Sequence, residues 1–171
     1  SKVLHSGQVL EIKEGAISLI AGSVAALVTI IFGAEYIFAP GFFDFAYPVT
    51  YPAWLRWVGA FCLLIGILLL WRAHHHLGLS FHSLVGSKKE QTLIQSGPYR
   101  WIRHPIYTAY LLNYIGGGLL AANLVLTVIP PLAFAVLVIV RIPIEEQVLT
   151  EKFGQQYKAY KQNTGRLLPK V

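Results

Sequence analysis

The chain has 171 residues, a formal net charge of +6 at pH 7 and one cysteine. Hydrophobic residues make up 55% of it and charged residues 13%, against about 25% charged in an average soluble domain. The apolar residues fall in long runs, so the composition excludes an ordinary soluble domain and predicts an all-α integral membrane protein. The basic residues flank these runs, so we expect membrane lipids, and not nucleic acid, as their partners.

Four apolar runs predict a bundle of four transmembrane helices, at about 15–39, 53–72, 106–122 and 124–140. Only Asn123 separates the third run from the fourth, which predicts a tight helical hairpin. Three consecutive glycines at 116–118 permit close helix contact or a local bend. The proline pair at 130–131 should kink the fourth helix.

Lysine and arginine predict the orientation, because cytoplasmic loops of membrane proteins carry an excess of them. The segment at 42–52, between the first two runs, has none, and Arg56 alone lies on that side. The connection at 72–105 and both terminal segments carry all the other basic residues. The sequence therefore predicts both termini and the 72–105 connection in the cytoplasm, which agrees with an even number of crossings.

The polar tail at 141–171 is expected to begin as a new helix. Pro143 suits a first helical turn, and Glu145 and Glu146 suit the positive end of a helix dipole. Apolar residues alternate with charged ones further along, so this amphipathic helix should lie on the membrane surface or pack over the bundle.

Three consecutive histidines, His74, His75 and His76, raise the question of a metal site. Adjacent helical residues point about 100° apart, so three in a row do not converge on one ion. We expect no metal. The histidines should instead cap the cytoplasmic end of the second helix, near the negative end of its dipole.

The polar motifs follow one another in a fixed order. "SGPYRWIRHPIY" at 96–107 precedes the hairpin, and "RIPIEE" at 141–146, "FGQQYKAY" at 153–160 and "GRLLP" at 165–169 follow it. This combination resembles the isoprenylcysteine carboxyl methyltransferase family over residues 77–171. We therefore expect one membrane domain over 1–171, in which 15–76 are variable N-terminal spans and 77–171 form the cofactor and catalytic region.

The resemblance implies a membrane enzyme that uses S-adenosylmethionine, with the cofactor enclosed on the cytosolic side by the connection and the tail. It assigns Arg141 to the substrate, and it makes Arg141 and Glu145 the catalytic pair. A histidine is common in relatives where this chain has Gln91. The residues that it assigns to the cofactor are Gln91, Thr92, Leu93, Ile94, Tyr99, His104, Pro105, Ile106, Tyr107 and Glu145.

The residue types suit methyl transfer, which is an in-line displacement that depends on positioning. A substrate carboxylate is already ionised at neutral pH, and an arginine can hold it in a bidentate fork. The acceptor implied is a prenylcysteine-like acid or another lipophilic molecule entering from the bilayer. Arg141 and Glu145 are four residues apart and share a helix face only if the helix includes Arg141, which Pro143 could prevent.

Three alternatives stay open at this point. A methyltransferase acting on a phospholipid amine would need a base to take a proton from the ammonium group. An NADPH-dependent sterol or enone reductase would need further polar groups for the nucleotide phosphates, and the 72–105 connection is short for that purpose. The third alternative is a non-catalytic membrane protein on the same scaffold.

Overall fold

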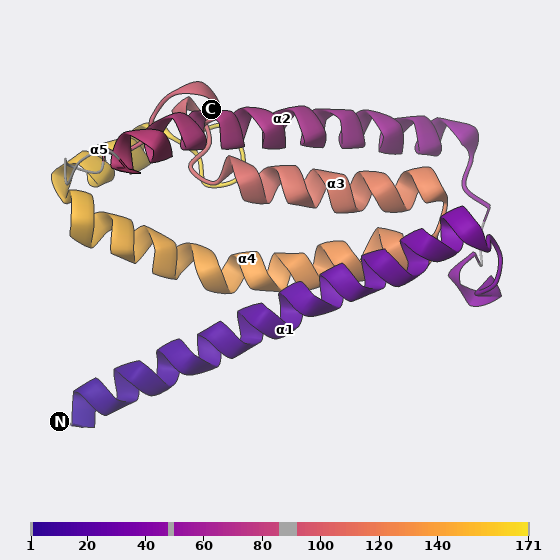
Figure 1. Cartoon of the computed structure of the whole chain (residues 1–171), viewed down its shortest axis with the longest axis horizontal. Coiled ribbons are helices and arrows are strands. Elements are labelled where there is room, and N and C mark those ends of the chain that lie inside the picture. The colour runs from indigo at the N-terminus through magenta and orange to yellow at the C-terminus, as the bar shows by residue number, and fades with distance from the viewer. Residues whose placement is uncertain (1, 48–49, 86–91, 171) are drawn as a thin grey trace. The chain divides into compact units, whose positions relative to one another are not determined.

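The computed structural model of this chain describes the backbone of residues 2–47, 50–85 and 92–170, with side chains at 15–47, 50–78 and 92–170. Figure 1 shows that the named elements in these ranges are all helical, which confirms the all-α class. They are α1 (Lys2–Phe38), α2 (Ala53–Val85), α3 (Pro105–Ala121), α4 (Leu124–Phe153) and α5 (Gln155–Asn163), with the short 3-10 helices η1 (Asp44–Ala46) and η2 (Gly97–Arg100).

Among the described residues, three helical segments are long and apolar enough to cross a membrane by length and composition: Gly15–Phe38, Ala53–Gly78 and Leu124–Phe153. They support an integral membrane protein. Helix α3 has 17 residues, which gives it a length of about 25 Å, less than the usual hydrocarbon thickness. A fourth crossing by α3 therefore stays a prediction.

Two predicted helix boundaries are wrong. Helix α2 continues to Val85, so the three histidines lie within it and do not cap its end. Helix α4 runs without a break to Phe153, so no new helix begins at 141 and Pro143 is an interior residue. A helix tolerates proline where side chains or neighbouring elements compensate for the lost hydrogen bond.

By its contacts the chain divides into two compact units. The first unit contains Ser1–Leu63 and Tyr114–Ile144, and the second contains Leu64–Asn113 and Glu145–Val171. The boundary crosses α2, α3 and α4, so each unit takes part of these helices.

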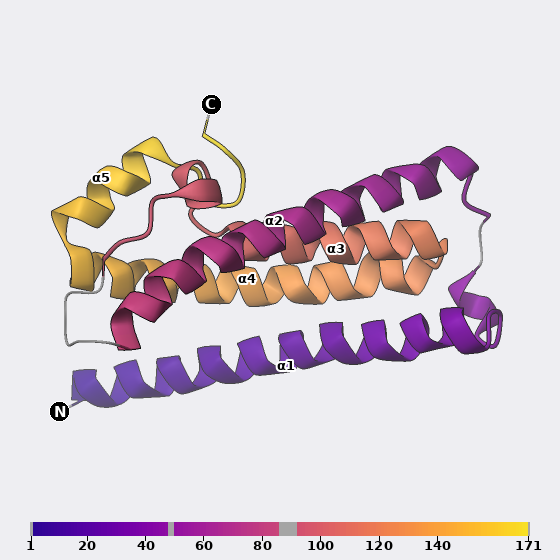
Figure 2. The same ribbon diagram turned by 45° about the horizontal axis from the view of Figure 1, so that its top comes forward.

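Close helix contacts build the first unit. An added Cβ at Gly59 on α2 would lie 2.6 Å from the backbone nitrogen of Leu120 and 2.8 Å from the carbonyl oxygen of Gly116. Figure 2 shows α2 and α3 running side by side, as this contact requires. A Cβ at Gly118 would lie 2.4 Å from the Cα of Thr127 on α4. Two of the three consecutive glycines therefore make the predicted close contacts, whereas Gly117 faces open space.

The predicted hairpin between α3 and α4 is confirmed. Ala122 takes a left-handed conformation at φ 54°, and the backbone N–H of Asn123 donates to the carbonyl of Gly118. The Asn123 side chain then accepts from the backbone N–H of Leu126, at 3.0 Å, as a helix N-cap does. One residue thus contributes to the end of one helix and the start of the next.

The polar residues near the ends of the apolar helices in this unit have partners. Buried Glu35 accepts from the backbone N–H of Gly41 at 2.8 Å and from the hydroxyl of Tyr47 at 2.5 Å. Arg56 donates to the carbonyl of Leu120, near the end of α3, at 3.0 Å. These contacts offset the cost of polar groups beside apolar surface.

We expect Gly59→Ala to lower the free energy of unfolding by about 1–3 kcal/mol, because the new methyl group overlaps backbone atoms that cannot move aside. The matched control is Gly117→Ala, where nothing lies within 4 Å and alanine should stabilise the helix by up to about 1 kcal/mol. Chemical unfolding of both variants in detergent measures the difference. Equal stability of the two variants would contradict the close packing of α2 on α3.

Candidate functional site

The site in the second unit begins with a short turn before α3 that packs on the C-terminal segment. An isolated parallel β-bridge joins Ile102 to Gly165. The backbone N–H of Arg103 donates to the carbonyl of Gly165 at 2.8 Å, and that of His104 donates to the carbonyl of Arg166 at 3.1 Å. Thr108 fixes the next residue of the segment through its hydroxyl, which donates to the carbonyl of Leu167 at 2.6 Å. These hydrogen bonds fix the position of the turn against the C-terminal segment.

Glycine is required at the start of this turn. Gly97 has φ +58°, a left-handed conformation that suits glycine, and an added Cβ would lie 2.2 Å from the ring of His76 on α2. His76 also lies within hydrogen-bonding distance of the hydroxyl of Ser96, at 3.2 Å. Gly97 of the "GPY" motif therefore lets the segment before α3 approach α2 closely.

Glu146 links the turn before α3 to helix α5 and to the C-terminal segment. Its side chain is only 4% exposed, and it forms ion pairs with three cations: Arg103 at 3.0 Å, Lys161 at 3.0 Å and Arg166 at 3.1 Å. Arg103 also donates to the carbonyls of Lys161 and Thr164. A buried carboxylate is tolerated only when it is paired in this way.

Glu145 points to a different set of partners. The hydroxyl of Tyr107 donates to one of its oxygens at 2.5 Å. The Nδ1 atom of His104 lies 3.6 Å from the other oxygen, and the Nε2 atom lies 3.5 Å from Glu146. The His104 ring stacks on that of Tyr107, with 5.8 Å between the centroids. His104 is thus held between the two adjacent glutamates.

The ionisation of these groups follows from their burial. Burial lowers the pKa of His104, against the opposing effect of Glu145 and Glu146, so the ring favours its neutral form. Burial raises the pKa of Tyr99 to about 12, so its phenol is neutral. The site therefore combines neutral aromatic groups with carboxylates.

A cavity of about 310 Å³ lies between these residues. Six of the residues assigned to the cofactor line it: Tyr99, His104, Pro105, Ile106, Tyr107 and Glu145. Three residues that the resemblance did not assign to the cofactor complete the lining: Leu77, Arg103 and Leu149. Helical spacing alone could have found Leu149, one turn beyond Glu145.

The other predicted site residues are not among those lining this cavity. Thr92 is exposed, and Leu93 and Ile94 are half-buried. Arg141 is an exposed residue of the first unit, whereas the cavity belongs to the second. The prediction for Gln91 falls outside the described residues.

The interpretation of Glu145 and Glu146 as helix-start residues is wrong. They lie in the interior of α4, more than one turn before its end at Phe153, so neither end of the helix dipole acts strongly on them. Their contacts with Tyr107, Arg103, Lys161 and Arg166 account for them instead. Because α4 is continuous, Arg141 and Glu145 are one turn apart on the same helix.

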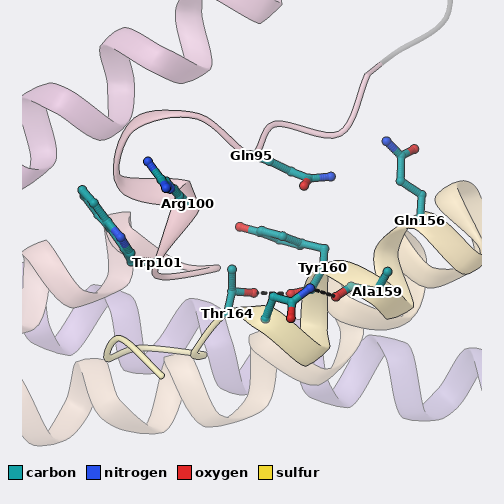
Figure 3. Close-up of a pocket in the computed structure, with 8 residues that line it drawn as sticks. Gln95, Arg100, Trp101, Gln156, Ala159, Tyr160 and Thr164 are labelled. Atoms are coloured by element: carbon teal, nitrogen blue, oxygen red, sulfur yellow. Dashed lines mark hydrogen bonds between the residues drawn. The ribbon is translucent and has the colours of Figure 1, made fainter. Parts of the chain in front are cut away.

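A second, larger hollow of about 560 Å³ shares no lining residue with the first. Figure 3 shows it between the segment that precedes α3 and helix α5. Its lining consists of Gln95, Arg100, Trp101, Gln156, Ala159, Tyr160, Asn163 and Thr164. Among the described residues, no group of three or more histidine, cysteine or acidic side chains is placed to hold a metal ion.

Membrane-length helices and a cavity walled by an imidazole, a phenol and a carboxylate define an integral membrane protein with a candidate binding site at the start of α3. The model of the isoprenylcysteine carboxyl methyltransferase (ICMT) family matches residues 57–151. The chain belongs to this family, which confirms the resemblance carried by the motifs.

Two of three similar proteins have names that agree with this assignment. The chain is 30% identical over 156 residues to protein-S-isoprenylcysteine O-methyltransferase B of Arabidopsis thaliana, covering 87% of this chain and 74% of the relative. It is 32% identical over 121 residues to protein-S-isoprenylcysteine O-methyltransferase of Saccharomyces cerevisiae, covering 66% and 48%. It is also 32% identical over 87 residues to the cobalt-zinc-cadmium resistance protein CzcN of Cupriavidus metallidurans, covering 51% and 40%. The chain thus spans less than half the length of the latter two.

We expect Glu146→Gln to lower the free energy of unfolding by about 3 kcal/mol, because the neutral amide leaves the buried guanidinium of Arg103 without its counter-charge. The control is Glu151→Gln on the same helix, an exposed residue whose change should cost less than about 0.5 kcal/mol. Chemical unfolding measures both. Equal effects would show that Glu146 is as well solvated as a surface residue.

His104 should give the protein a measurable pH dependence. Its folded-state pKa lies below its ordinary value of 6.5, so below pH 6.5 the unfolded chain takes up a proton that the folded chain resists. The free energy of unfolding should therefore fall as the pH drops from about 6.5 toward about 5. His104→Gln should flatten this slope, whereas His75→Gln, which changes an exposed ring, should not. A wild-type slope in His104→Gln would contradict the burial effect.

Proposed function

We propose that this chain transfers the methyl group of S-adenosylmethionine to the carboxylate of a lipophilic, prenylcysteine-like acid, giving a methyl ester and S-adenosylhomocysteine. The observation that carries this proposal is the cavity at the start of α3, where six residues that the family resemblance assigns to the cofactor meet. The family assignment and the relatives' names support the same reaction.

The residues of the cavity fit this cofactor. When bound, the cofactor supplies an electrophilic methyl group on a positively charged sulfur. Glu145 offers a carboxylate to a positive part of it, and Tyr107 orients that carboxylate through its hydroxyl. Tyr99, Ile106, Leu77 and Leu149 supply aromatic and aliphatic surface of the kind that surrounds bound cofactors. His104 adds a neutral ring nitrogen that can donate or accept.

Arg141 is proposed as the substrate residue. The proposal is supported by the spacing of Arg141 and Glu145, which are one turn apart on the continuous helix α4. Its guanidinium can hold both oxygens of a carboxylate and so aim one of them. Charge is lost when a carboxylate and a sulfonium react, so surroundings of low dielectric constant favour the transfer.

The membrane arrangement is proposed in finer detail. We infer that α3 provides a fourth crossing, that both termini and the active site face the cytoplasm, and that 1–171 form one functional domain. The supporting observation is the distribution of lysine and arginine, which are absent from the segment at 42–52. The acceptor would then reach the site from the bilayer.

A lipid amine is the second candidate acceptor. It would need a base, and the neutral imidazole of His104 in the cavity wall could take the proton. The carboxylate acceptor is preferred because Arg141 would repel a cationic headgroup. A nanodisc assay with methyl-labelled cofactor distinguishes the two: label should pass to a farnesylated N-acetylcysteine as a base-labile ester. Transfer only to an aminophospholipid would overturn the proposed acceptor.

We expect Glu145→Ala to weaken S-adenosylhomocysteine binding by at least about tenfold, because loss of one partner of a desolvated charged contact costs about 2–5 kcal/mol. Calorimetry on the nanodisc-embedded protein measures the affinity. Glu151→Ala removes an exposed carboxylate from the same helix and serves as the control. Unchanged affinity in Glu145→Ala would remove Glu145 from the cofactor site.

Arg141→Lys should fold and should bind S-adenosylhomocysteine as the wild type does. Its turnover of the prenylcysteine acid should fall at least about tenfold, or about 1.4 kcal/mol of transition-state stabilisation, because lysine cannot form the two parallel hydrogen bonds of the fork. Arg72→Lys, at an exposed position on α2, is the control for a general loss of guanidinium. Near-normal turnover in Arg141→Lys would point to an acceptor without a carboxylate.

A further inference from the structure

The larger hollow, of about 560 Å³, is lined mainly by polar side chains and by one positively charged side chain. Figure 3 shows the side chains of Gln95 and Arg100 on one wall and those of Gln156 and Tyr160 on the facing helix α5. Arg100 is the one formally charged residue among those that line it, and no carboxylate does. Arg100, Gln95 and Gln156 are all exposed residues, so a ligand can reach them from outside the hollow.

The end of α5 does not oppose an anion here, because its carbonyls are occupied. The carbonyl of Ala159 accepts from the side chain of Asn163, and that of Tyr160 accepts from the hydroxyl of Thr164. The carbonyl of Gln162 accepts from Lys170 at 2.6 Å. The negative end of the helix is therefore largely satisfied, and a guanidinium with two carboxamides determines the chemistry of the hollow.

The position of the hollow points to the membrane surface. Arg100 and Trp101 precede the apolar helix α3, and Trp101 is 57% exposed. Tryptophan and arginine side by side ahead of a membrane helix are typical of the headgroup layer. A ligand at this level can place its phosphate at Arg100 and its apolar part beside Trp101.

We propose that this hollow binds the headgroup of an anionic phospholipid, a phosphodiester whose hydroxylated headgroup meets the carboxamides of Gln95 and Gln156. A choline headgroup has no hydroxyl for these carboxamides, so phosphatidylglycerol should be preferred to phosphatidylcholine.

One hydrogen bond links a residue of the proposed lipid site to a residue of the proposed cofactor cavity. Tyr160 lines the larger hollow, and its hydroxyl donates to the carbonyl of Tyr99 at 2.6 Å. Tyr99 lines the smaller cavity. A headgroup that immobilises Tyr160 therefore also steadies Tyr99, and this effect on the cofactor rests on the proposed function.

Native mass spectrometry of protein released from nanodiscs tests the lipid site directly. The nanodiscs contain phosphatidylcholine with a minority of phosphatidylglycerol. Wild type should retain phosphatidylglycerol, and Arg100→Gln should retain it about fivefold less, as expected for loss of a charge-assisted contact. Lys158→Gln removes an exposed cation from α5 outside the hollow and should behave as wild type. Equal retention in both variants would overturn the proposal.

Two further measurements separate the possible sources of phosphate and the dependence on the cofactor. Inorganic phosphate added to phosphatidylcholine nanodiscs should not stabilise the protein, and Arg100-dependent stabilisation by it would overturn the lipid assignment. S-adenosylhomocysteine should bind about threefold more tightly with phosphatidylglycerol present. Equal affinity in the two membranes would overturn the proposed effect of the lipid on the cofactor cavity. Absence of S-adenosylhomocysteine binding in either membrane, with Arg100-dependent lipid retention intact, would overturn the proposed function and not the lipid site.

Discussion

The second unit depends on one constraint, which is that the buried carboxylate of Glu146 must be neutralised. Its three cations come from three separate segments: Arg103 from the turn before α3, Lys161 from α5 and Arg166 from the C-terminal segment. Buried ion pairs add little net stability, but loss of one partner is costly, so they act mainly by excluding other arrangements. The carboxylate thereby fixes where the chain's end lies against the turn, and the backbone bonds between them complete the fit.

The two adjacent glutamates, Glu145 and Glu146, contact different partners. Neighbouring residues on a helix point about 100° apart, so Glu146 meets the cations while Glu145 meets Tyr107 and lines the cavity. His104 lies between them, within 3.6 Å of Glu145 and 3.5 Å of Glu146. The buried imidazole of His104 thus contacts both Glu146, whose ion pairs hold the C-terminal segment, and Glu145, which lines the proposed cofactor cavity. The chain that carries this arrangement belongs to a family of membrane methyltransferases.

The parts of the structure that could be predicted were those with local signals. Asn123 and the glycines at 116–118 predicted the hairpin and its close contacts. The family resemblance carried by the "HPIY" motif and the later motifs predicted six of the residues in the cavity wall. The full length of α4 was not predicted, because a proline usually marks the start of a helix. Pro143 instead lies in the interior of α4, where its surroundings tolerate it. The pairing of Arg103 with Glu146 joins residues 43 positions apart, and no local pattern shows such a pair.

We propose that the cavity at the start of α3 holds S-adenosylmethionine. The most direct test is calorimetric titration of the wild-type protein in nanodiscs with S-adenosylhomocysteine and, separately, with NADPH. We predict saturable binding of S-adenosylhomocysteine with one site per chain and no binding of NADPH. Binding of NADPH, with no binding of S-adenosylhomocysteine, would contradict the proposed cofactor and would favour a membrane reductase.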